Sequence, residues 1–299
     1  MRGVIVPLVT PLLDRDTLDT GGLERLIEHV LAGGVQGLFI LGTTGEGPSL
    51  GYRLRHELIE RTCRLAAGRV PVMVGITDTA FVESVRLART AADGGAAAVV
   101  AAPPYYYPAR QPELVEYLEH LAAELPLPLL LYNLPGYTKV PFEPETVRAA
   151  AAMPGIVGMK DSSGDMAYFR RVQAVLKDRA EFTLMVGPDL LLAECVLSGA
   201  HGGVCGGANL LPKVFVDLYL AAAARDLKAI GPLQAQVAAI NERIYGLEPH
   251  PAGYLEGLKC ALACLGICGD FLVEPFHCFG RGEREVIRRN LAEMGLRPA

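Results

Sequence analysis

Residues 154–165 read PGIVGMKDSSGD, a short apolar run that ends in one lysine and is followed by polar and glycine residues. Ile156, Val157 and Met159 indicate a buried strand, which places Lys160 at the C-terminal tip of that strand. Burial disfavours the charged form of an amine, and a neutral amine attacks a ketone whereas an ammonium does not. The stretch is compatible with a reactive lysine, but taken alone it favours a structural lysine that extends from a strand end into solvent. The rest of the chain shifts the balance toward the reactive lysine.

Similar apolar runs recur through the first 225 residues, and amphipathic helical patterns alternate with them. The eight predicted strands cover residues 3–9, 37–41, 70–75, 96–101, 127–131, 156–160, 182–186 and 202–205. Such alternation calls for a parallel sheet covered by helices, and eight units within about 220 residues favour closure into a barrel. We therefore predict an α/β fold, a (β/α)8 TIM barrel over 1–225 that holds the active site. Residues 226–299 form a predicted C-terminal helical extension packed on the barrel.

The composition excludes several classes of protein. The 299 residues are 51% hydrophobic and 20% charged, with a formal net charge of −5 and no basic block, which argues against a nucleic-acid partner. No apolar run reaches the roughly 18 residues of a membrane span, and the N-terminal apolar stretch is too short for a signal peptide. We expect a cytoplasmic protein with no membrane partner. No glycine-rich nucleotide-binding motif follows the first strand.

Neither the cysteines nor the histidines suggest a metal site. The seven cysteines contain no Cys-x-x-Cys pair, and Cys260, Cys264 and Cys268 follow one stripe of a predicted helix without other ligands at suitable spacing. These three are predicted to be buried small hydrophobic residues. The six histidines are scattered through the chain, and none pairs with another at ligand spacing. The sequence predicts no metal.

The C-terminal ends of barrel strands share one face, and catalytic groups of such barrels lie there. The residues predicted at these ends are Thr43, Thr44, Tyr105, Tyr106, Tyr107, Tyr132, Lys160, Asp189 and Gly206. The predicted fold thus places a lysine, several phenols and two adjacent hydroxyl groups together at the C-terminal end of the barrel.

Each of these groups has a use if Lys160 forms an imine. A phenol such as Tyr132 can move the proton that carbinolamine formation and dehydration require, and Thr43 can relay it to water. The turn around Thr44 can direct backbone N–H groups and a hydroxyl at a carboxylate. A 2-keto acid supplies both the ketone and the carboxylate, and its protonated imine accepts electrons during C–C cleavage or formation.

The motifs that carry a resemblance are GTTGE at 42–46, PYY at 104–106, Tyr-Asn-x-Pro at 132–135 and Gly-x-Lys-Asp at 158–161. Together they resemble the dihydrodipicolinate synthase/N-acetylneuraminate lyase family of class I pyruvate-type aldolases. The resemblance covers most of the chain and implies a (β/α)8 barrel with a helical extension, in a homotetramer built from tight dimers. It also implies a covalent Schiff base on lysine, with no metal or organic cofactor, and pyruvate and an aldehyde or sugar acid as substrates.

The resemblance further implies a role for each matching residue. Lys160 would be the Schiff-base lysine, Tyr132 the proton-shuttling phenol, Thr43 part of the relay and Thr44 a ligand of the keto-acid carboxylate. Tyr106 matches the tyrosine that reaches into the neighbouring subunit's site. The pocket-lining positions of the family fall on Gly187 and Val204.

Three departures from the family pattern bear on the substrate. Synthases carry an arginine, which binds the carboxylate of the aldehyde substrate, at the position of Tyr137, and a phenol cannot replace a bidentate guanidinium. Lys139 or Arg110 could supply a cation, but neither occupies the family's position. Tyr52 and Arg55 replace the histidines of lysine-regulated synthases, so lysine feedback is not expected.

The loops after the last two strands point toward a different branch. Asp189 matches a carboxylate that sialic acid lyases use on sugar hydroxyls, whereas Gly206 stands where those lyases have a hydroxyl residue. Residues 160–165 and 202–209 are most similar to the sugar-acid and hydroxy-keto-acid aldolase branches, although turn formation also explains both segments.

The leading hypothesis is therefore a lyase that reversibly cleaves a 2-keto-3-deoxy sugar acid, or a related 4-hydroxy-2-keto acid, to pyruvate and an aldehyde. One alternative is a 4-hydroxy-tetrahydrodipicolinate synthase that condenses pyruvate with aspartate semialdehyde. Others are a Schiff-base sugar-acid dehydratase and a non-catalytic keto-acid binder.

Overall fold

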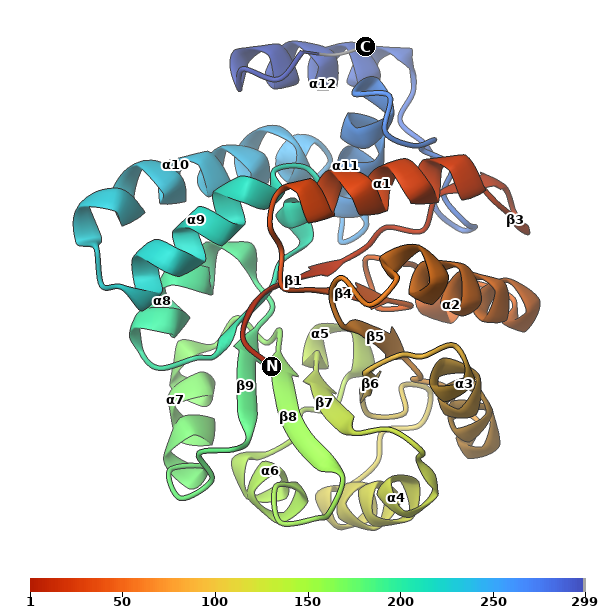
Figure 1. The fold of residues 1–299 in the computed structure, drawn as a ribbon, viewed down its shortest axis with the longest axis vertical. Helices are drawn as coiled ribbons and strands as arrows, with labels where there is room; N and C mark the ends of the chain where they lie inside the picture. Colours follow the sequence, from red (N-terminus) through yellow and green to blue (C-terminus); the bar gives the residue numbers. More distant parts are fainter. Residues whose placement is uncertain (298–299) are drawn as a thin grey trace.

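A closed barrel of parallel strands lies at the centre of the molecule, in a computed structural model that describes residues 1–297 (Figure 1). Its strands are β1 (Gly3–Pro7), β4 (Gly37–Ile40), β5 (Val72–Gly75), β6 (Ala98–Ala101), β7 (Leu129–Asn133), β8 (Ile156–Asp161), β9 (Thr183–Val186) and β10 (Gly202–Val204). They follow the order β1-β10-β9-β8-β7-β6-β5-β4, and each neighbouring pair is parallel. The predicted (β/α)8 barrel is confirmed.

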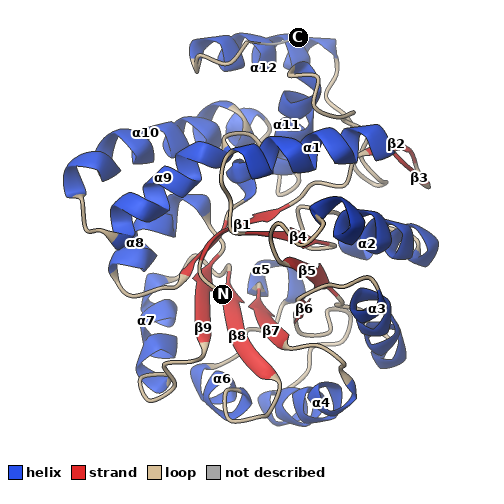
Figure 2. Ribbon diagram, in the orientation of Figure 1, coloured by secondary structure: helices blue, strands red, loops and turns tan. Residues whose placement is uncertain are grey.

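Helices surround the barrel (Figure 2). Those within the barrel repeats are α1 (Thr20–Ala32), α2 (Tyr52–Ala66), α3 (Phe81–Asp93), α4 (Gln111–Glu124), α5 (Pro135–Thr138), α6 (Pro144–Ala150), α7 (Met166–Val175), α8 (Leu192–Leu197) and α9 (Pro212–Ala223). The chain continues into α10 (Leu227–Arg243), α11 (Gly253–Cys264) and α12 (Arg281–Glu293). Short 3-10 turns lie at η1 (Gly47–Ser49), η2 (Asp189–Leu191), η3 (Gly206–Asn209) and η4 (Tyr245–Leu247). No helix within residues 1–297 is long and apolar enough to cross a bilayer.

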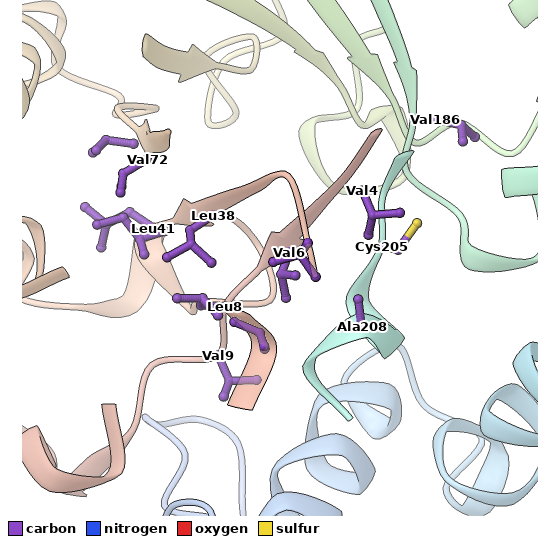
Figure 3. Close-up of a cluster of buried hydrophobic side chains, with 14 of the residues drawn as sticks. Val4, Val6, Leu8, Val9, Leu38, Leu41, Val72, Val186, Cys205 and Ala208 are labelled. Atoms are coloured by element: carbon purple, nitrogen blue, oxygen red, sulfur yellow. The ribbon is translucent and has the colours of Figure 1, made fainter. Parts of the chain in front are cut away.

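The two faces of each strand are buried in different places. Ile5 of β1 belongs to a cluster inside the barrel, whereas Val4 and Val6 pack outward against the helices. Figure 3 shows Val4, Val6 and Leu38 in the outer layer, which lies between strands and helices. Because both faces are covered, the strands read as continuous apolar runs, and this is why they are recognisable from sequence.

The first barrel repeat differs from the prediction. The strand that was expected to reach residue 9 ends at Pro7, and an unpredicted antiparallel pair follows, β2 (Leu12–Asp14) and β3 (Thr17–Leu18). Leu8, although outside β1, still donates its backbone N–H to the Phe39 carbonyl at 2.9 Å. The two strands have three and two residues and are joined by the charged residues Arg15 and Asp16, and such short strands carry no periodicity to detect.

The expected cysteine stripe is interrupted. Helix α11 ends at Cys264, and Gly266 adopts a left-handed φ of 71°, so Cys268 lies beyond the helix. The prediction that all three cysteines share one helix is therefore wrong. Cys260, Cys264 and Cys268 are nevertheless buried, as predicted.

The C-terminal helices share their core with the barrel. Leu258 and Leu262 of α11 and Ile240 of α10 belong to the same buried cluster as the outward faces of the strands. Helix α11 packs against α12, which lies at the outer end of the molecule in Figure 1, and Arg25 of α1 donates to the Ile267 carbonyl just after α11. The segment from residue 250 onward also reaches the C-terminal ends of the barrel strands, where the main cavity opens.

Candidate active site

A cavity of about 390 Å³ lies at the C-terminal end of the barrel. Its wall comes from the loops after β4 to β7 and from the C-terminal extension. The residues that line it are Phe39, Leu41, Gly42, Thr43, Glu46, Pro48, Ser49, Gly75, Thr77, Val100, Ala102, Tyr105, Tyr132, Leu134, Tyr137, Thr138, His250, Pro251, Ala252, Tyr254, Leu255 and Phe276. The cavity thus opens at the C-terminal ends of the strands, where the sequence analysis predicts the active site.

Lys160 and Tyr132 are direct neighbours on adjacent strands. The register of β7 and β8 pairs the two residues, so both side chains point into the barrel. The Lys160 Nζ lies 4.1 Å from the centre of the Tyr132 ring and 5.3 Å from that of Phe39. Lys160 is 6% exposed and lies beside the cavity wall, behind the two rings that form part of it.

Asn133 and Asp161, the residues that follow Tyr132 and Lys160, hold the two strands together on the outer face of the barrel. Asn133 pairs with Asp161 in the register, and the Asn133 Nδ2 donates to the Asp161 Oδ1 at 2.8 Å. The Asn133 Oδ1 accepts from the Phe142 N–H, and the Asp161 carboxylate accepts from the Ser163 N–H and hydroxyl. Burial raises the pKa of Asp161, and these hydrogen bonds partly offset the effect. In each of the Tyr-Asn and Lys-Asp dipeptides the first residue, Tyr132 or Lys160, points into the barrel. The second residue, Asn133 or Asp161, points outward and hydrogen-bonds the two strands to each other and to the following loops.

The two threonines of the glycine-rich turn have different partners. The Thr43 hydroxyl and the Tyr132 phenol share a hydrogen bond of 3.2 Å. The Thr44 side chain is buried near the phenol of Tyr254, whose pKa is raised by burial. Thr43 lines the cavity and Thr44 does not. Sequence analysis missed Tyr254, because nothing in its local pattern shows that α11 returns to the barrel mouth.

Asp189 is buried and already has partners. It accepts hydrogen bonds from the Gly207 N–H at 2.8 Å and the Tyr245 phenol at 3.2 Å. Burial raises the pKa of Asp189 to about 6, while these donors and the Lys160 charge oppose the shift. Tyr245, in the extension, was not predicted, since the contact spans 56 residues.

The other small residues predicted for the pocket do not line this cavity. Val204 is buried inside the barrel, and a Cβ on Gly206 would meet the Tyr245 phenol at 3.3 Å. Gly187 lies nearer the lysine, where a Cβ would come within 3.2 Å of the Lys160 Cε and would clash with the Ser162 hydroxyl. Glycine at 187 therefore leaves the space that the Lys160 side chain needs.

The three consecutive tyrosines separate. Tyr105 lines the cavity, whereas Tyr106 and Tyr107 are 74% and 79% exposed and pack edge to face on each other. Within residues 1–297 of one chain, Tyr106 therefore makes no part of the cavity wall. Tyr137, at the family's arginine position, lines the cavity, and its phenol donates to the Pro251 carbonyl at 3.1 Å.

The two cations considered as substitutes point elsewhere. The Lys139 Nζ donates to the Gly136 carbonyl, and Arg110 forms an exposed ion pair with Glu113. Neither residue lines the cavity, and its wall contains no lysine or arginine from residues 1–297.

Sequence analysis also missed a buried ion pair next to the Gly-Thr-Thr-Gly turn of residues 42–45. The Glu46 Oε1 lies 2.6 Å from the Lys259 Nζ, and the two side chains are 1% and 0% exposed. The Glu46 Oε2 accepts from the Val273 N–H, while Lys259 also donates to the Thr10 and Phe271 carbonyls. All polar groups of the pair are satisfied, which makes burial of both charges tolerable.

Comparisons with known proteins agree with this geometry. A sequence profile described as the dihydrodipicolinate synthetase family matches residues 1–293. The chain belongs to this family. It is an enzyme, a lyase of the Schiff-base aldolase type, as the sequence analysis predicts.

Individual relatives span the full length of the chain. A 4-hydroxy-tetrahydrodipicolinate synthase from Methylibium petroleiphilum is 32% identical over 98% of each chain. The structure of dihydrodipicolinate synthase from Bacteroides thetaiotaomicron is 54% identical, with a TM-score of 0.95 and 98% of each chain covered. YagE, a prophage protein of this family from E. coli K12 whose structure contains pyruvate, is 27% identical with a TM-score of 0.93 over 99% of each chain.

Proposed function

We propose that the protein cleaves a 4-hydroxy-2-keto acid, the class that includes 2-keto-3-deoxy sugar acids, reversibly to pyruvate and an aldehyde through an imine on Lys160. The observation that carries this proposal is the sequence of contacts from amine to phenol to hydroxyl. Lys160 faces the Tyr132 ring, and the Tyr132 phenol is hydrogen-bonded to Thr43 on the cavity wall. These are the groups that carbonyl addition and proton transfer require.

The first step forms the imine. The neutral Lys160 amine adds to C2 of the keto acid and gives a carbinolamine. Tyr132 donates its phenolic proton to the departing hydroxyl, water leaves, and a phenolate remains beside the positive iminium. The hydrogen bond to Thr43 holds the phenol in place and connects it to the cavity, through which water exchanges its protons.

Cleavage and release follow with the same groups. The Tyr132 phenolate takes the proton of the C4 hydroxyl, the C3–C4 bond breaks, and its electrons neutralise the iminium to an enamine as the aldehyde departs. Tyr132 then returns the proton to C3. Water adds to the restored iminium, and pyruvate leaves the free amine. We assign binding of the keto-acid carboxylate to the backbone N–H groups of the turn that contains Thr44, because glycine-rich turns of this kind bind anions.

The exposed Tyr106 belongs to the same proposal. Its ring extends from the β6–α4 loop, is 74% exposed and, among residues 1–297, packs on the ring of Tyr107. We expect it to complete the site of a neighbouring subunit in a homotetramer built from tight dimers.

A second candidate is 4-hydroxy-tetrahydrodipicolinate synthase activity, which the names of the relatives favour. Aspartate semialdehyde carries a carboxylate, and the described cavity wall has Tyr137 rather than a cation to receive it. Burying an unpaired carboxylate is costly, so we expect poor condensation of aspartate semialdehyde with pyruvate. A rate comparable to that of the cleavage reaction would favour the synthase.

The imine itself is tested by reduction with borohydride in the presence of pyruvate, read by peptide mass spectrometry. We expect a pyruvyl-sized adduct on the Lys160 peptide and none in Lys160→Ala. The peptide that contains Lys259, another buried lysine, serves as the internal control and stays unmodified. If saturating pyruvate leaves Lys160 unlabelled, the aldolase proposal fails and a non-catalytic binder takes its place.

A further inference from the structure

Aromatic side chains from four separate segments line the cavity in addition to Phe39 and Tyr132. Tyr105 comes from the loop after β6, Tyr137 from α5, Tyr254 from α11 and Phe276 from the segment after α11. Leu134 and Ala252 line the same cavity. The aldehyde part of a substrate attached to Lys160 would extend toward these rings, because Tyr132 and Phe39 connect the amine to the wall.

Several polar groups of this wall are engaged with the protein. The Tyr137 phenol donates to the Pro251 carbonyl at 3.1 Å. The Thr138 hydroxyl bonds to the carbonyls of Leu134 and Val140, and the Thr77 hydroxyl accepts from the Ala102 N–H. A polyhydroxy chain would need a partner for each hydroxyl that it withdraws from water, and the groups engaged in this way are not free to supply one.

No lysine or arginine is available to a second carboxylate. The wall formed by residues 1–297 contains neither, and its one histidine, His250, accepts the Ala252 N–H at Nδ1. Its one acidic residue, Glu46, is paired with Lys259. Asp189, which could have bound sugar hydroxyls, is instead hydrogen-bonded to Gly207 and Tyr245 away from this wall. The wall therefore matches an anionic or a polyol aldehyde less well than an aromatic one.

We propose that the aldehyde released by this enzyme is uncharged and aromatic, and that its ring packs among Tyr105, Tyr137, Tyr254 and Phe276. This inference rests on the proposed Schiff-base cleavage and specifies its substrate class. Aromatic rings gain free energy from edge-to-face and offset contacts with one another in addition to burial. A cavity of about 390 Å³ also falls within the range of small-molecule sites.

The test compares three substrates by kcat/KM with the wild-type enzyme. The first is 4-hydroxy-2-oxo-4-phenylbutanoate, the second a 2-keto-3-deoxyhexonate, and the third the pair of pyruvate and aspartate semialdehyde. We expect the aryl compound to exceed the hexonate by at least about tenfold and the aspartate semialdehyde reaction by about 100-fold, as apolar fit and an unpaired charge would give. A preference for the hexonate or for aspartate semialdehyde overturns the inference.

Tyr137→Arg tests the wall directly, since it adds a cation among the rings. We expect at least about a tenfold gain for aspartate semialdehyde relative to the aryl compound. Tyr107→Arg adds the same charge at a side chain that is 79% exposed and outside the wall, and its ratio of the two activities should match the wild type. An unchanged ratio in Tyr137→Arg overturns the inference.

Tyr137→Phe separates the loss of the phenol from the gain of the charge, and it serves if the arginine variant fails to fold. It keeps the ring and removes only the hydrogen bond to Pro251. We expect it to keep the preference for the aryl compound over the hexonate, and a reversal of this preference overturns the inference.

Borohydride trapping distinguishes the two levels of failure. If pyruvate is trapped on Lys160 but the aryl compound is not preferred, the substrate inference alone fails. If pyruvate is not trapped, the Schiff-base proposal fails, and the substrate inference fails with it.

Discussion

The pKa of Asp189 is set by burial of its carboxyl and by a few hydrogen-bond donors. Its carboxyl is almost completely enclosed, which raises its pKa to about 6, and the Gly207 N–H, the Tyr245 phenol and the charge of Lys160 limit the shift. In the unfolded chain the same carboxyl has its ordinary pKa of 3.8. The folded protein therefore binds more protons than the unfolded chain between these two pH values.

This difference predicts that stability falls as pH rises from about 4 to about 6, by about 2–3 kcal/mol from this residue, and then levels off. Asp189→Asn keeps an acceptor for the Gly207 N–H but cannot ionise, so this part of the pH dependence should disappear. Urea unfolding at several pH values measures it, with the exposed Asp178→Asn as a control for the loss of one charge. A slope in Asp189→Asn equal to that of the wild type would contradict the explanation.

The position of the turn that holds Thr43 and Thr44 depends on contacts among the turn itself, α11 and the segment after β1. The turn that holds them follows β4, and Glu46 within it pairs with Lys259 of α11 while also accepting the Val273 N–H. Lys259 in turn bonds to the Thr10 carbonyl after β1, and the Thr10 hydroxyl donates to the Gly45 carbonyl. Glu46 adopts a left-handed φ of 55°, and this network supports that conformation.

Lys259→Met would leave the Glu46 carboxylate buried without its cation. We expect a loss of about 3–5 kcal/mol in the free energy of unfolding, whereas the double variant Glu46→Gln, Lys259→Met should lose clearly less because no charge is left unpaired. Denaturant titrations of the wild type, both single variants and the double variant give the four unfolding free energies of a double-mutant cycle. If the double variant loses the sum of the two single losses, the pair is not coupled in this way.

At the scale of the whole molecule, the C-terminal extension acts as part of the barrel. Tyr254 and Leu255 line the cavity, Lys259 holds the threonine turn, and Tyr245 contacts Asp189. We propose that residues 226–299 do not form a separable unit, because their apolar residues and those of the barrel bury one another.

A chain of residues 1–225 should accordingly fail to fold, since it exposes this apolar surface and leaves Glu46 unpaired. Size-exclusion chromatography and thermal circular dichroism measure the outcome. The matched control is the full chain with a protease site inserted in the exposed segment after Arg225 and then cleaved, which should remain assembled through its contacts. A soluble 1–225 fragment with a cooperative melting transition would refute the prediction.

Local sequence is sufficient to place Lys160 and Tyr132 on strand ends, because apolar runs buried on both faces differ plainly from amphipathic helices. It also indicates the Gly-Thr-Thr-Gly turn, since short polar segments that follow such runs form the loops of an α/β barrel. These features depend on residues that are near one another in the chain. The barrel and the position of these residues at the ends of its strands could be predicted in this way, and the resemblance of their motifs to a known family predicted the enzyme class.

The rest of the site depends on contacts between distant segments. That Tyr254 lines the cavity, that Lys259 neutralises Glu46 and that Tyr245 bonds to Asp189 cannot be predicted from periodicity, because a helix pattern specifies which face is buried but not what it meets. The same holds for the cavity wall, where residues 1–297 contribute rings from several segments but no lysine or arginine. Packing of the extension against the barrel therefore decides the shape and polarity of the site around the lysine.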